Sequence, residues 1–458
     1  MTNPELNDIL QLVYNKKNVF ITGPGGTGKT TMIREIYKSL VDNGVKVYNV
    51  APTGAAAVNM IGGTTIHSFM GVGINLDKSP PDKVERFIKG KIKNRFRNTN
   101  VLIIDEISMV GAKFLDKLNK VAQLIRYNTE PFGGVTIIAS GDFLQLSPVK
   151  DDYCFKSQTW KDLNFIPMVF NTPHRFVDKE HFEVLQRVRM GEHTLEDVEY
   201  LGDRNMKRHP DLMKDIGEIK PTSLSSLRRD VNDINMNELA KLPGKAKPYT
   251  SKDVVLLRTG EKNDLGDDVC VSIHDLVHSN IKAILKADGV PIDVENYKTQ
   301  MDNIYASHIV FKEGAQVMLT ANLNIEDGLI HGSRGVVKEL RENSVVVLFK
   351  NGQCVEIEYL GRDFDVDSPN SANGQGLKVR RAQIPLILAW SVTIHKSQGA
   401  TLDCVELDLG PGLFAPGQAY VALSRCRSKD GIYIKNLKPS RFIVDKSAVT
   451  FTKNLEIC

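Results

Sequence analysis

Gly23-Pro24-Gly25-Gly26-Thr27-Gly28-Lys29-Thr30 is the stretch that decides the fold of this chain. It fits the phosphate-binding pattern G-x-x-x-x-G-K-[ST] at every fixed position, and it follows the apolar run 19–21, which predicts a strand. A helix over 30–40 should follow the loop. In such a loop the backbone N–H groups surround phosphates, while Lys29 reaches the β- and γ-oxygens and the Thr30 hydroxyl binds Mg²⁺. The alternative interpretation is a glycine-rich turn in front of a helix.

A second apolar run, 101–104, predicts a buried parallel strand that ends in Asp105 and Glu106. Ligands of open α/β sheets bind beyond the carboxyl ends of the strands. We therefore expect Asp105 to hold Mg²⁺ through water and Glu106 to act as the general base for an attacking water. The alternative is a strand whose solvated end carries two acids, and the P-loop upstream argues against it.

A third apolar run, 135–139, leads into Ser140-Gly141-Asp142-Phe143-Leu144-Gln145. If this strand lies beside the P-loop strand, its carboxyl end brings the Gln145 amide close to the terminal phosphate. We therefore assign Gln145 to the same site.

These motifs resemble the Pif helicase family (petite integration frequency) of superfamily 1, which has RecD-like relatives. The resemblance covers most of the chain, and it is specific because the motifs occur together in a fixed order. Besides the motifs already quoted, it rests on 51–57 (APTGAAA), 65–69 (TIHSF), 131–134 (PFGG), 314–319 (GAQVML), 332–337 (GSRGVV), 393–402 (TIHKSQGATL) and 419–425 (AYVALSR).

The resemblance implies an α/β protein with two tandem RecA-like P-loop motor domains, a small wedge insertion and an SH3-like β-barrel insertion. The expected bounds are 1–170 for the first motor domain, with the wedge at 70–100, then 171–250 with 382–458 for the second, and 251–381 for the β-rich insertion. Strand-type runs support that insertion at 315–320, 335–340 and 344–349, and the hairpin signal Asn351-Gly352 precedes a further run at 355–358.

The resemblance further implies ATP as the nucleotide, Mg²⁺ as its metal, and ATP-driven 5′→3′ movement on single-stranded DNA with unwinding of duplex DNA. The residues from Gly23 to Thr30, with Thr31 and Gln418, would bind ATP. Arg175 would reach the γ-phosphate from the second wall of the cleft, and Arg425 would be the arginine finger that stabilises transition-state charge. The alternative for either arginine is a surface salt bridge.

For DNA, the resemblance points to three loops that follow predicted strands. Contacts from such loops position a nucleic-acid strand without reading its sequence, which suits a motor that must move over any base. A hydroxyl or an imidazole at a strand end can also serve only as a turn or cap residue. The implied residues are Thr53 and Gly54, then His67, Ser68 and Phe69, and finally His395, Lys396 and Ser397.

The segment 83–97 is strongly basic and forms about half of the predicted wedge. Its only acid is Glu85, and its aromatic residues Phe87 and Phe96 could stack on bases, as in proteins that bind single strands. The alternative is a solvated basic helix whose two aromatic residues face the core. The basic residues are Lys83, Arg86, Lys89, Lys91, Lys93, Arg95 and Arg97.

The sequence departs from the family pattern in front of the P-loop. Family members carry a glutamine there that reads adenine, whereas this chain has Pro4-Glu5-Leu6-Asn7-Asp8. Asn7, Gln11 or the backbone are the alternatives for that role. Ser147, where the family has proline, is interpreted as a neutral loop change.

Length and composition fit a multidomain protein without a membrane segment. The 458 residues predict two to four domains, and 41% hydrophobic with 25% charged residues is ordinary for a soluble protein. A net charge of +4 is too small to indicate a polyanionic partner by itself. Six scattered cysteines without a C-x-x-C pair argue against a zinc site or a disulfide framework. We therefore expect a reducing intracellular compartment: the cytoplasm of a bacterium or of a virus-infected cell, or a eukaryotic nucleus.

The expected partners are single-stranded and tailed duplex DNA, and replication or repair proteins such as a single-strand-binding protein, with the chain itself a monomer. Two other functions share the motifs: a DNA-stimulated ATPase that translocates without unwinding, and a RecD-like subunit of a recombination or repair complex. A DNA-binding module without enzymatic activity is disfavoured, because its ATP residues would have no reason to be intact.

Overall fold

The computed structural model describes residues 4–58, 60–72, 80–88, 90–213, 217–262, 268–272, 302, 306–324, 327–366 and 377–455. The chain forms two compact units, one made of Met1–Ile234 with Trp390–Cys458 and the other of Asn235–Ala389. The predicted insertion, 251–381, falls inside the second unit, which starts earlier and ends later. Much of its first half, and 73–79 and 89 of the predicted wedge, lie outside the described residues.

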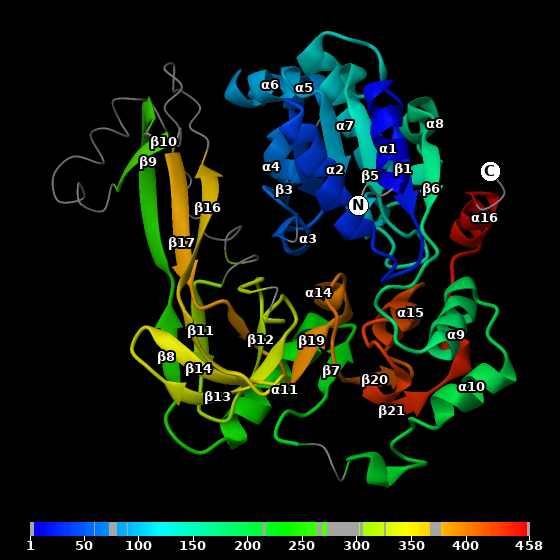
Figure 1. Ribbon diagram of the computed structural model, residues 1–458, viewed down its shortest axis with the longest axis vertical. Coiled ribbons are helices and arrows are strands. Elements are labelled where there is room, and N and C mark those ends of the chain that lie inside the picture. Colours follow the sequence, from blue (N-terminus) through cyan, green and yellow to red (C-terminus); the bar gives the residue numbers. More distant parts are fainter. Residues whose placement is uncertain are drawn as a thin grey trace. The chain divides into compact units, whose positions relative to one another are not determined.

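Six parallel strands form the first sheet, in the order β3-β2-β4-β5-β1-β6 (Figure 1). The predicted strands 19–21, 101–104 and 135–139 are confirmed, and β5 pairs directly with β1, as the assignment of Gln145 required. The strands are β1 Val19–Thr22, β2 Val47–Ala51, β3 Thr64–Thr65, β4 Val101–Ile104, β5 Thr136–Ser140 and β6 Ile166–Val169.

The strands of this sheet are apolar on both faces because helices cover both. Val19 and Ile21 pack with the helices around the P-loop, whereas Phe20, between them in sequence, packs on the opposite side. This alternation follows from the two-residue period of a strand. One face carries α1 Pro4–Tyr14 and α2 Lys29–Asp42, and the other carries α7 Ala112–Arg126 and α8 Gln158–Leu163.

The segment 80–97 forms two short helices that pack on the core of the first sheet. Ile88, Ile92 and Phe96 are buried there, so the stacking role considered for Phe96 is wrong. Part of the basic charge is also engaged within the chain: Lys93 pairs with Glu85 at 2.6 Å. The short helices that follow β2, β3 and the undescribed residues are α3 Gly54–Val58, α4 Ile66–Met70, α5 Pro81–Phe87 and α6 Gly90–Arg97.

Four parallel strands form a second sheet in the same compact unit, in the order β19-β7-β20-β21. The strands are β7 Thr222–Ser225, β19 Ser391–Thr393, β20 Val405–Leu409 and β21 Ile432–Leu437. The helices of this part are α9 Lys179–Met190, α10 Leu195–Gly202, α11 Arg228–Lys241, α14 Ile394–Ser397 and α15 Gln418–Leu423. Two parallel sheets confirm the predicted α/β class.

The C-terminal helix, α16 Lys446–Leu455, packs on the first sheet and not on the second, to which 382–458 was assigned. Ala448 is fully buried in the core that contains Phe20, and Phe451 stacks on Phe155 at 4.3 Å. The reason is chemical, because the exposed side of that core is rich in aromatic rings that an apolar helix can cover. The described residues of this unit also form short 3₁₀ turns at Ile107–Met109, Pro131–Gly134, Cys154–Lys156, Pro210–Met213, Lys429–Gly431 and Pro439–Arg441.

The second compact unit is built from antiparallel strands, as predicted for an insertion rich in β-structure. Five of them follow the order β15-β14-β13-β12-β18, and Gly352, with φ +85°, turns the predicted hairpin between β14 and β15. The strands are β8 Lys247–Thr250, β9 Lys252–Lys262, β10 Asp268–Ser272, β11 His308–Phe311, β12 Gln316–Leu319, β13 Arg334–Leu340, β14 Ser344–Phe349, β15 Cys354–Glu358, β16 Leu360–Val366, β17 Leu377–Gln383 and β18 Leu386–Leu388.

Candidate active site

The P-loop has the backbone geometry of an anion site. Gly23, Gly26 and Gly28 have φ values of 137°, 86° and 89°, which side-chain-bearing residues rarely adopt. A β-carbon on Gly23 would lie 2.1 Å from the carbonyl oxygen of Phe170. Gly28 caps α2 without a side-chain hydrogen bond, and the first turn of α2 contains no acid. The helix N-terminus therefore offers its free N–H groups and its dipole to a phosphate, and the residues present fit one.

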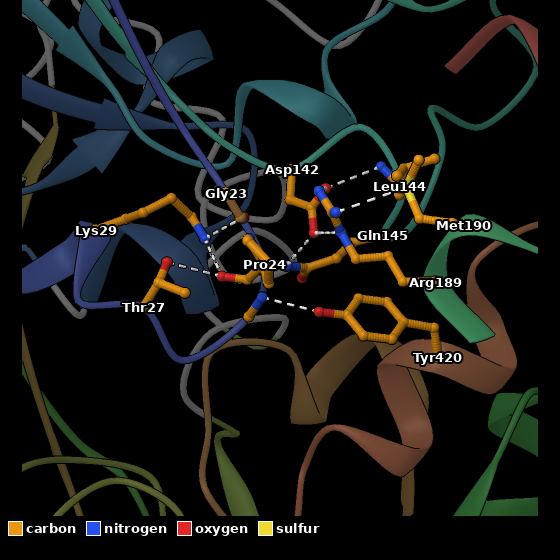
Figure 2. A network of polar contacts seen from close by, with 11 residues as sticks. Gly23, Pro24, Thr27, Lys29, Asp142, Leu144, Gln145, Arg189, Met190 and Tyr420 are labelled. Carbon is orange, nitrogen blue, oxygen red and sulfur yellow. Dashed lines mark hydrogen bonds and ion pairs between the residues drawn. The ribbon is translucent and has the colours of Figure 1, made fainter. Parts of the chain in front are cut away.

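The Lys29 ammonium lies inside this loop. Its Nζ donates to the carbonyl oxygens of Gly23 and Pro24, each at 2.8 Å, as Figure 2 shows. Burial lowers the pKa of Lys29, while the charge of Asp142 opposes that shift. A phosphate would therefore meet a cation that is already desolvated and held in the loop.

Asp105 and Glu106 follow β4 at the carboxyl edge of the sheet, as predicted. Burial raises the pKa of Asp105, and burial together with the Asp105 charge raises the pKa of Glu106 to about 7. Two adjacent carboxyls in a poorly solvated site cannot both ionise easily. A carboxyl with a pKa near 7 is well matched to the transfer of a proton at neutral pH.

Glu106 has a left-handed backbone conformation, with φ 52° and ψ 41°. Residues other than glycine rarely adopt it, and such strain gathers at functional sites. The carboxylate accepts a hydrogen bond from the Gln398 amide at 2.8 Å. Gln398 was not assigned a role from the sequence, although it lies within the quoted stretch 393–402.

The structure brings Gln145 to the P-loop side of the site through Asp142. Gln145 Nε2 donates to Asp142 Oδ2 at 3.3 Å, and Arg189 of α9 donates to both carboxylate oxygens of Asp142 at 3.0 and 2.8 Å. Both ionic side chains are almost completely buried. Burial alone would raise the pKa of Asp142, but the charge and hydrogen bonds of Arg189, the Lys29 charge and the Leu144 N–H together hold the pKa below its usual range. Sequence reasoning missed Arg189, because nothing in its local pattern marks it.

Arg425 is buried close to the P-loop, with Nη2 3.6 Å from a β-carbon built on Gly25. Its side chain is 1% exposed, and its guanidinium donates to the carbonyl oxygens of Val421, Ser397 and Ala400 and to the Ser424 hydroxyl, at 2.8 to 3.3 Å. A surface salt bridge, the alternative interpretation, is therefore wrong for Arg425. The residue is a buried cation, and burial lowers its pKa.

Arg175 comes from a different place than expected. It was assigned to the second wall, but its backbone N–H and that of His174 donate to the carbonyl oxygen of Gly26, so the segment is attached to the P-loop. Its guanidinium donates to the carbonyl oxygen of Ser424 at 3.1 Å. Burial and the Arg425 charge lower the pKa of Arg175 to about 9. Two arginines in one poorly solvated place favour an anionic ligand between them.

Two residues of α15 approach the P-loop region. The Tyr420 hydroxyl accepts a hydrogen bond from the Gly25 N–H at 2.9 Å, and Figure 2 shows the ring pointing at the loop. The Gln418 side-chain oxygen accepts from the N–H groups of Phe414 and Ala415, whereas its buried Nε2 has no hydrogen-bond partner among the described residues. Sequence reasoning assigned Gln418 but missed Tyr420, which stands two residues later.

The residues assigned to DNA follow strand ends, but all of them except Thr53 lie in the short helices α3, α4 and α14 and not in loops. Thr53 follows β2 and its hydroxyl accepts from the Ala56 N–H, so it does cap the short helix α3 that begins at Gly54. His67 stacks on Phe114 at 4.9 Å between ring centres. Ser68 and Lys396 are exposed and His395 is partly buried. Because β2 and β3 are parallel neighbours, Thr53 and His67 belong to the same edge of the sheet.

Two of the assigned DNA contacts are wrong. Phe69 is fully buried between Tyr48 and Phe96, with the Arg95 guanidinium over its ring, so no base can reach it. Ser397 is also fully buried, and its hydroxyl donates to the carbonyl oxygen of Ile394. Both residues serve packing or local structure.

Adenine and metal ligands are less clearly marked than the phosphate site. Asn7 and Gln11, the proposed substitutes for the missing glutamine, are both exposed on α1. In the described part of the chain, no three His, Cys, Asp or Glu side chains gather as a metal site. Thr30 and Asp105 could hold Mg²⁺ together only with oxygens of a nucleotide and water, which is the usual environment of this ion.

Among the residues that the structure describes, no helix is long and apolar enough to span a membrane.

Comparison with protein families identifies two matching profiles. The profile of PIF1-like helicases matches residues 4–191, and that of the 2B domain of DNA helicase Pif1 matches residues 300–340. An ATP-dependent DNA helicase PIF1 of Danio rerio is 36% identical over 98% of this chain and 63% of its own length. The chain thus spans about three fifths of the vertebrate relatives it matches. A helicase Pif1 of Bdellovibrio bacteriovorus is 32% identical over 99% of this chain and 92% of its own length.

Solved structures agree over the whole chain. A Pif1 helicase from Candida albicans is 30% identical and superposes with a TM-score of 0.71, covering 99% of both chains. A Bacteroides Pif1 in complex with ADP-AlF4 is 26% identical with a TM-score of 0.75, covering 100% of this chain and 97% of the other. A Bacteroides Pif1 bound to single-stranded DNA is 26% identical, with a TM-score of 0.63 over 99% of this chain and 97% of the other.

Proposed function

Because this chain belongs to the Pif1 family of DNA helicases, we propose that it is an ATP-dependent DNA helicase. We propose that it moves 5′→3′ on single-stranded DNA and unwinds duplex DNA. Relatives with these folds bind ADP-AlF4 and single-stranded DNA, which supports ATP and a DNA strand as the two ligands here. Translocation requires that the ATP site and the DNA site be coupled, since each ligand can change the binding of the other only if it favours one conformation of the protein over another.

In the proposed reaction each residue at the carboxyl edge of the first sheet has a separate task. Lys29 and the P-loop N–H groups bind the phosphates, and Thr30 with Asp105 would hold Mg²⁺, which withdraws charge from the phosphate oxygens when bound. Glu106 takes the proton of the attacking water. Its pKa of about 7 leaves it ready both to accept and to release that proton near neutral pH.

Gln145, Arg175 and Arg425 would act on the terminal phosphate. The guanidinium groups stabilise the negative charge that builds on the transferred phosphoryl oxygens, and such a finger contributes about 10³–10⁵ in rate. The ion pair of Asp142 with Arg189 would hold Gln145 in position.

One observation carries the proposal: the loop 397–400 contacts both Glu106, the proposed general base, and Arg425, the proposed arginine finger. Gln398 donates to Glu106, and Arg425 donates to the carbonyl oxygens of Ser397 and Ala400. Lys396, one residue earlier, is exposed where the proposal places DNA. A strand bound at His395 and Lys396 would therefore shift the two groups that perform hydrolysis.

For the DNA path, we propose Thr53, Gly54, His67 and Ser68 on the first sheet and His395 with Lys396 on the second. The segment 70–100 remains our proposal for the strand-separating wedge. We propose a monomer that meets single-strand-binding or other replication and repair proteins on tailed DNA, in a reducing intracellular compartment. Cys154 and Cys354 are free thiols, which is consistent with such a compartment.

Strand displacement tests the function directly. Two matched duplexes, one with a 5′ single-stranded tail and one with a 3′ tail, are incubated with ATP and Mg²⁺, and Lys29→Ala serves as the blank. We expect unwinding of the 5′-tailed duplex alone. Glu106→Gln should keep ATP binding but stop turnover, because the amide cannot take the proton of water.

The other outcomes separate the alternatives. Unwinding only from the 3′ tail would contradict the direction. DNA-stimulated ATP hydrolysis without strand displacement on either duplex would indicate a translocase or a subunit that needs a partner. Full turnover in Glu106→Gln would remove Glu106 from the role of base.

A further inference from the structure

Tyr420 is a buried polar group at the P-loop to which the proposed reaction gives no task. Its side chain is 2% exposed, and its hydroxyl oxygen accepts from the Gly25 N–H at 2.9 Å (Figure 2). The two residues stand far apart in sequence, so the contact depends on the fold and not on a local turn. A hydroxyl that replaces water at a P-loop N–H stands where phosphate oxygens are expected.

The surroundings of Gly25 identify which phosphate that is. A β-carbon built on Gly25 would lie 3.5 Å from the Tyr420 hydroxyl oxygen, 3.6 Å from Arg425 Nη2 and 3.6 Å from Gln145 Nε2. Lys29 Nζ hydrogen-bonds to the carbonyls of the two residues just before Gly25. Two groups that are expected to act on the γ-phosphate, Arg425 and Gln145, therefore lie around the same point as Tyr420, and Lys29 contacts the two residues that precede it in the loop.

The Tyr420 hydroxyl can still donate one hydrogen bond. A phenol has one donor and two acceptor sites, and the Gly25 N–H uses only one acceptor. Burial and the nearby Asp142 charge raise the pKa of Tyr420, so the phenol stays protonated. Among the described residues the Gly25 N–H is its sole hydrogen-bond partner, so its proton is available for a ligand oxygen.

We propose that Tyr420 binds the terminal phosphate of ATP: it accepts from the Gly25 N–H and donates its own proton to a γ-phosphate oxygen. The inference rests on the proposed function and extends it, because it makes Tyr420 a residue that distinguishes triphosphate from diphosphate. A diphosphate has no oxygen at this point, and the hydroxyl then contributes nothing to its binding.

Tyr420→Phe tests the proposal, since it removes one oxygen and keeps the ring. The measured quantities are the dissociation constants of ADP and of the β,γ-imido analogue of ATP, each with Mg²⁺, and the kcat and KM of ATP hydrolysis. We expect the analogue to bind at least about tenfold more weakly, as for one lost hydrogen bond to a charged group, with a lower kcat. ADP affinity should stay within about twofold.

Tyr249→Phe is the matched control, because Tyr249 is equally buried and its hydroxyl donates to the carbonyls of Arg341 and Ser344 in the other compact unit. Neither nucleotide affinity should change in it. Equal weakening of ADP and analogue in Tyr420→Phe would mean that the hydroxyl only shapes the loop, and no weakening at all would mean that it has no role; both outcomes overturn the proposal.

Gly25→Ala gives an independent answer if Tyr420→Phe does not fold. Its methyl group would meet its neighbours at ordinary contact distance, so the loop can keep its conformation, but it would occupy the point between Tyr420, Arg425 and Gln145. The analogue should again lose more affinity than ADP, and equal losses would overturn the proposal.

A wild-type chain that binds neither nucleotide would refute the proposed function as well, whereas normal hydrolysis by wild type and by Tyr420→Phe would refute the inference alone.

Discussion

Glu106 combines three unusual properties in one residue. Its backbone is left-handed, its carboxyl pKa is raised to about 7, and one carboxylate oxygen accepts from Gln398. A left-handed conformation costs a residue with a side chain of order 1–3 kcal/mol, so neighbouring contacts must hold it in place. The Gln398 hydrogen bond is one such contact, and it also favours the ionised form of the carboxyl.

Gln398→Ala should therefore shift the acid side of the pH profile of ATP hydrolysis, where kcat/KM falls, to higher pH. kcat/KM reports the pKa of the free enzyme, so wild type should lose activity as pH falls through about 7, where Glu106 takes up a proton. Without the amide donor the ionised form is less favoured, the Glu106 pKa rises, and activity is lost at a higher pH than in wild type. The measurement is kcat/KM against pH for both proteins.

Titration of the nucleotide itself affects wild type and Gln398→Ala equally. The informative quantity is therefore the difference between the two proteins in the pH at which kcat/KM falls on the acid side. Gln123→Ala, in α7, is a control glutamine that donates to the carbonyl of Thr129 away from the site. Superimposable acid sides of the pH profiles for wild type and Gln398→Ala would show that Gln398 does not set the protonation of Glu106.

Residues fall into two groups according to whether a local pattern could reveal them. The P-loop, Asp105, Glu106 and Gln145 follow apolar runs whose strands could be predicted, and they lie together because parallel strands end at one edge. Phe69 was misassigned because a five-residue helix has too little periodicity to tell a buried aromatic from an exposed one. Arg189 and Tyr420 were missed because their partners lie far away in sequence, where a contact leaves no pattern.

Among the elements, α16 is the one whose position the sequence hid. It follows β21 of the second sheet yet covers the aromatic core of the first, where Phe451 lies against Phe20, Phe143 and Phe155. This segment was assigned only by its place in the chain, after the second sheet, and apolar spacing along a helix does not indicate which of two sheets receives it. By contrast, β14 has the bounds predicted for it, because a continuous run of β-branched and apolar residues ends at a hairpin turn.

Phe451→Ala should destabilise the unit that contains the P-loop. Phe451 is partly buried against four aromatic rings, and removing it leaves a cavity in the core surface. Phenylalanine-to-alanine changes in cores cost about 3–5 kcal/mol, and partial exposure of this ring brings the expected loss to about 2 kcal/mol. Urea unfolding measures it, with Phe414→Ala, at a ring that is 60% exposed, as the control. Equal losses in both variants would place α16 away from this core.

At the scale of the molecule, the two compact units should unfold as partly separate transitions. Arg381 is buried in the second unit, where it donates to both carboxylate oxygens of Asp253, at 2.8 and 2.6 Å, and to Asp302. Arg381 is buried, but Asp253 and Asp302 are 30% and 43% exposed, so Arg381→Met leaves two partly solvated carboxylates and should lower the free energy of unfolding of this unit by about 1–2 kcal/mol. Calorimetry should show the loss in one transition, and ADP should still raise the other, because the nucleotide residues belong to the first unit.

Arg341→Met is the matched control for that experiment. Arg341 pairs with Glu339 and Glu356 in the same unit, but all three side chains are solvated. Exposed ion pairs contribute little to stability, so this variant should unfold like wild type. If both arginine variants lose the same stability, the Arg381 pair does not hold the unit together.

The position of the second compact unit between two neighbouring strands of the second sheet suggests how the chain could evolve. β7 leads into α11, and the chain later returns as β19, which lies parallel to β7 with Ser391 opposite Ser223. Asn235–Ala389 thus forms an insertion in the connection that leads from β7 through α11 to the parallel strand β19. Connections between strands tolerate insertions well. Lineages could lengthen, replace or discard Asn235–Ala389 while the crossover and the residues around the P-loop were inherited unchanged.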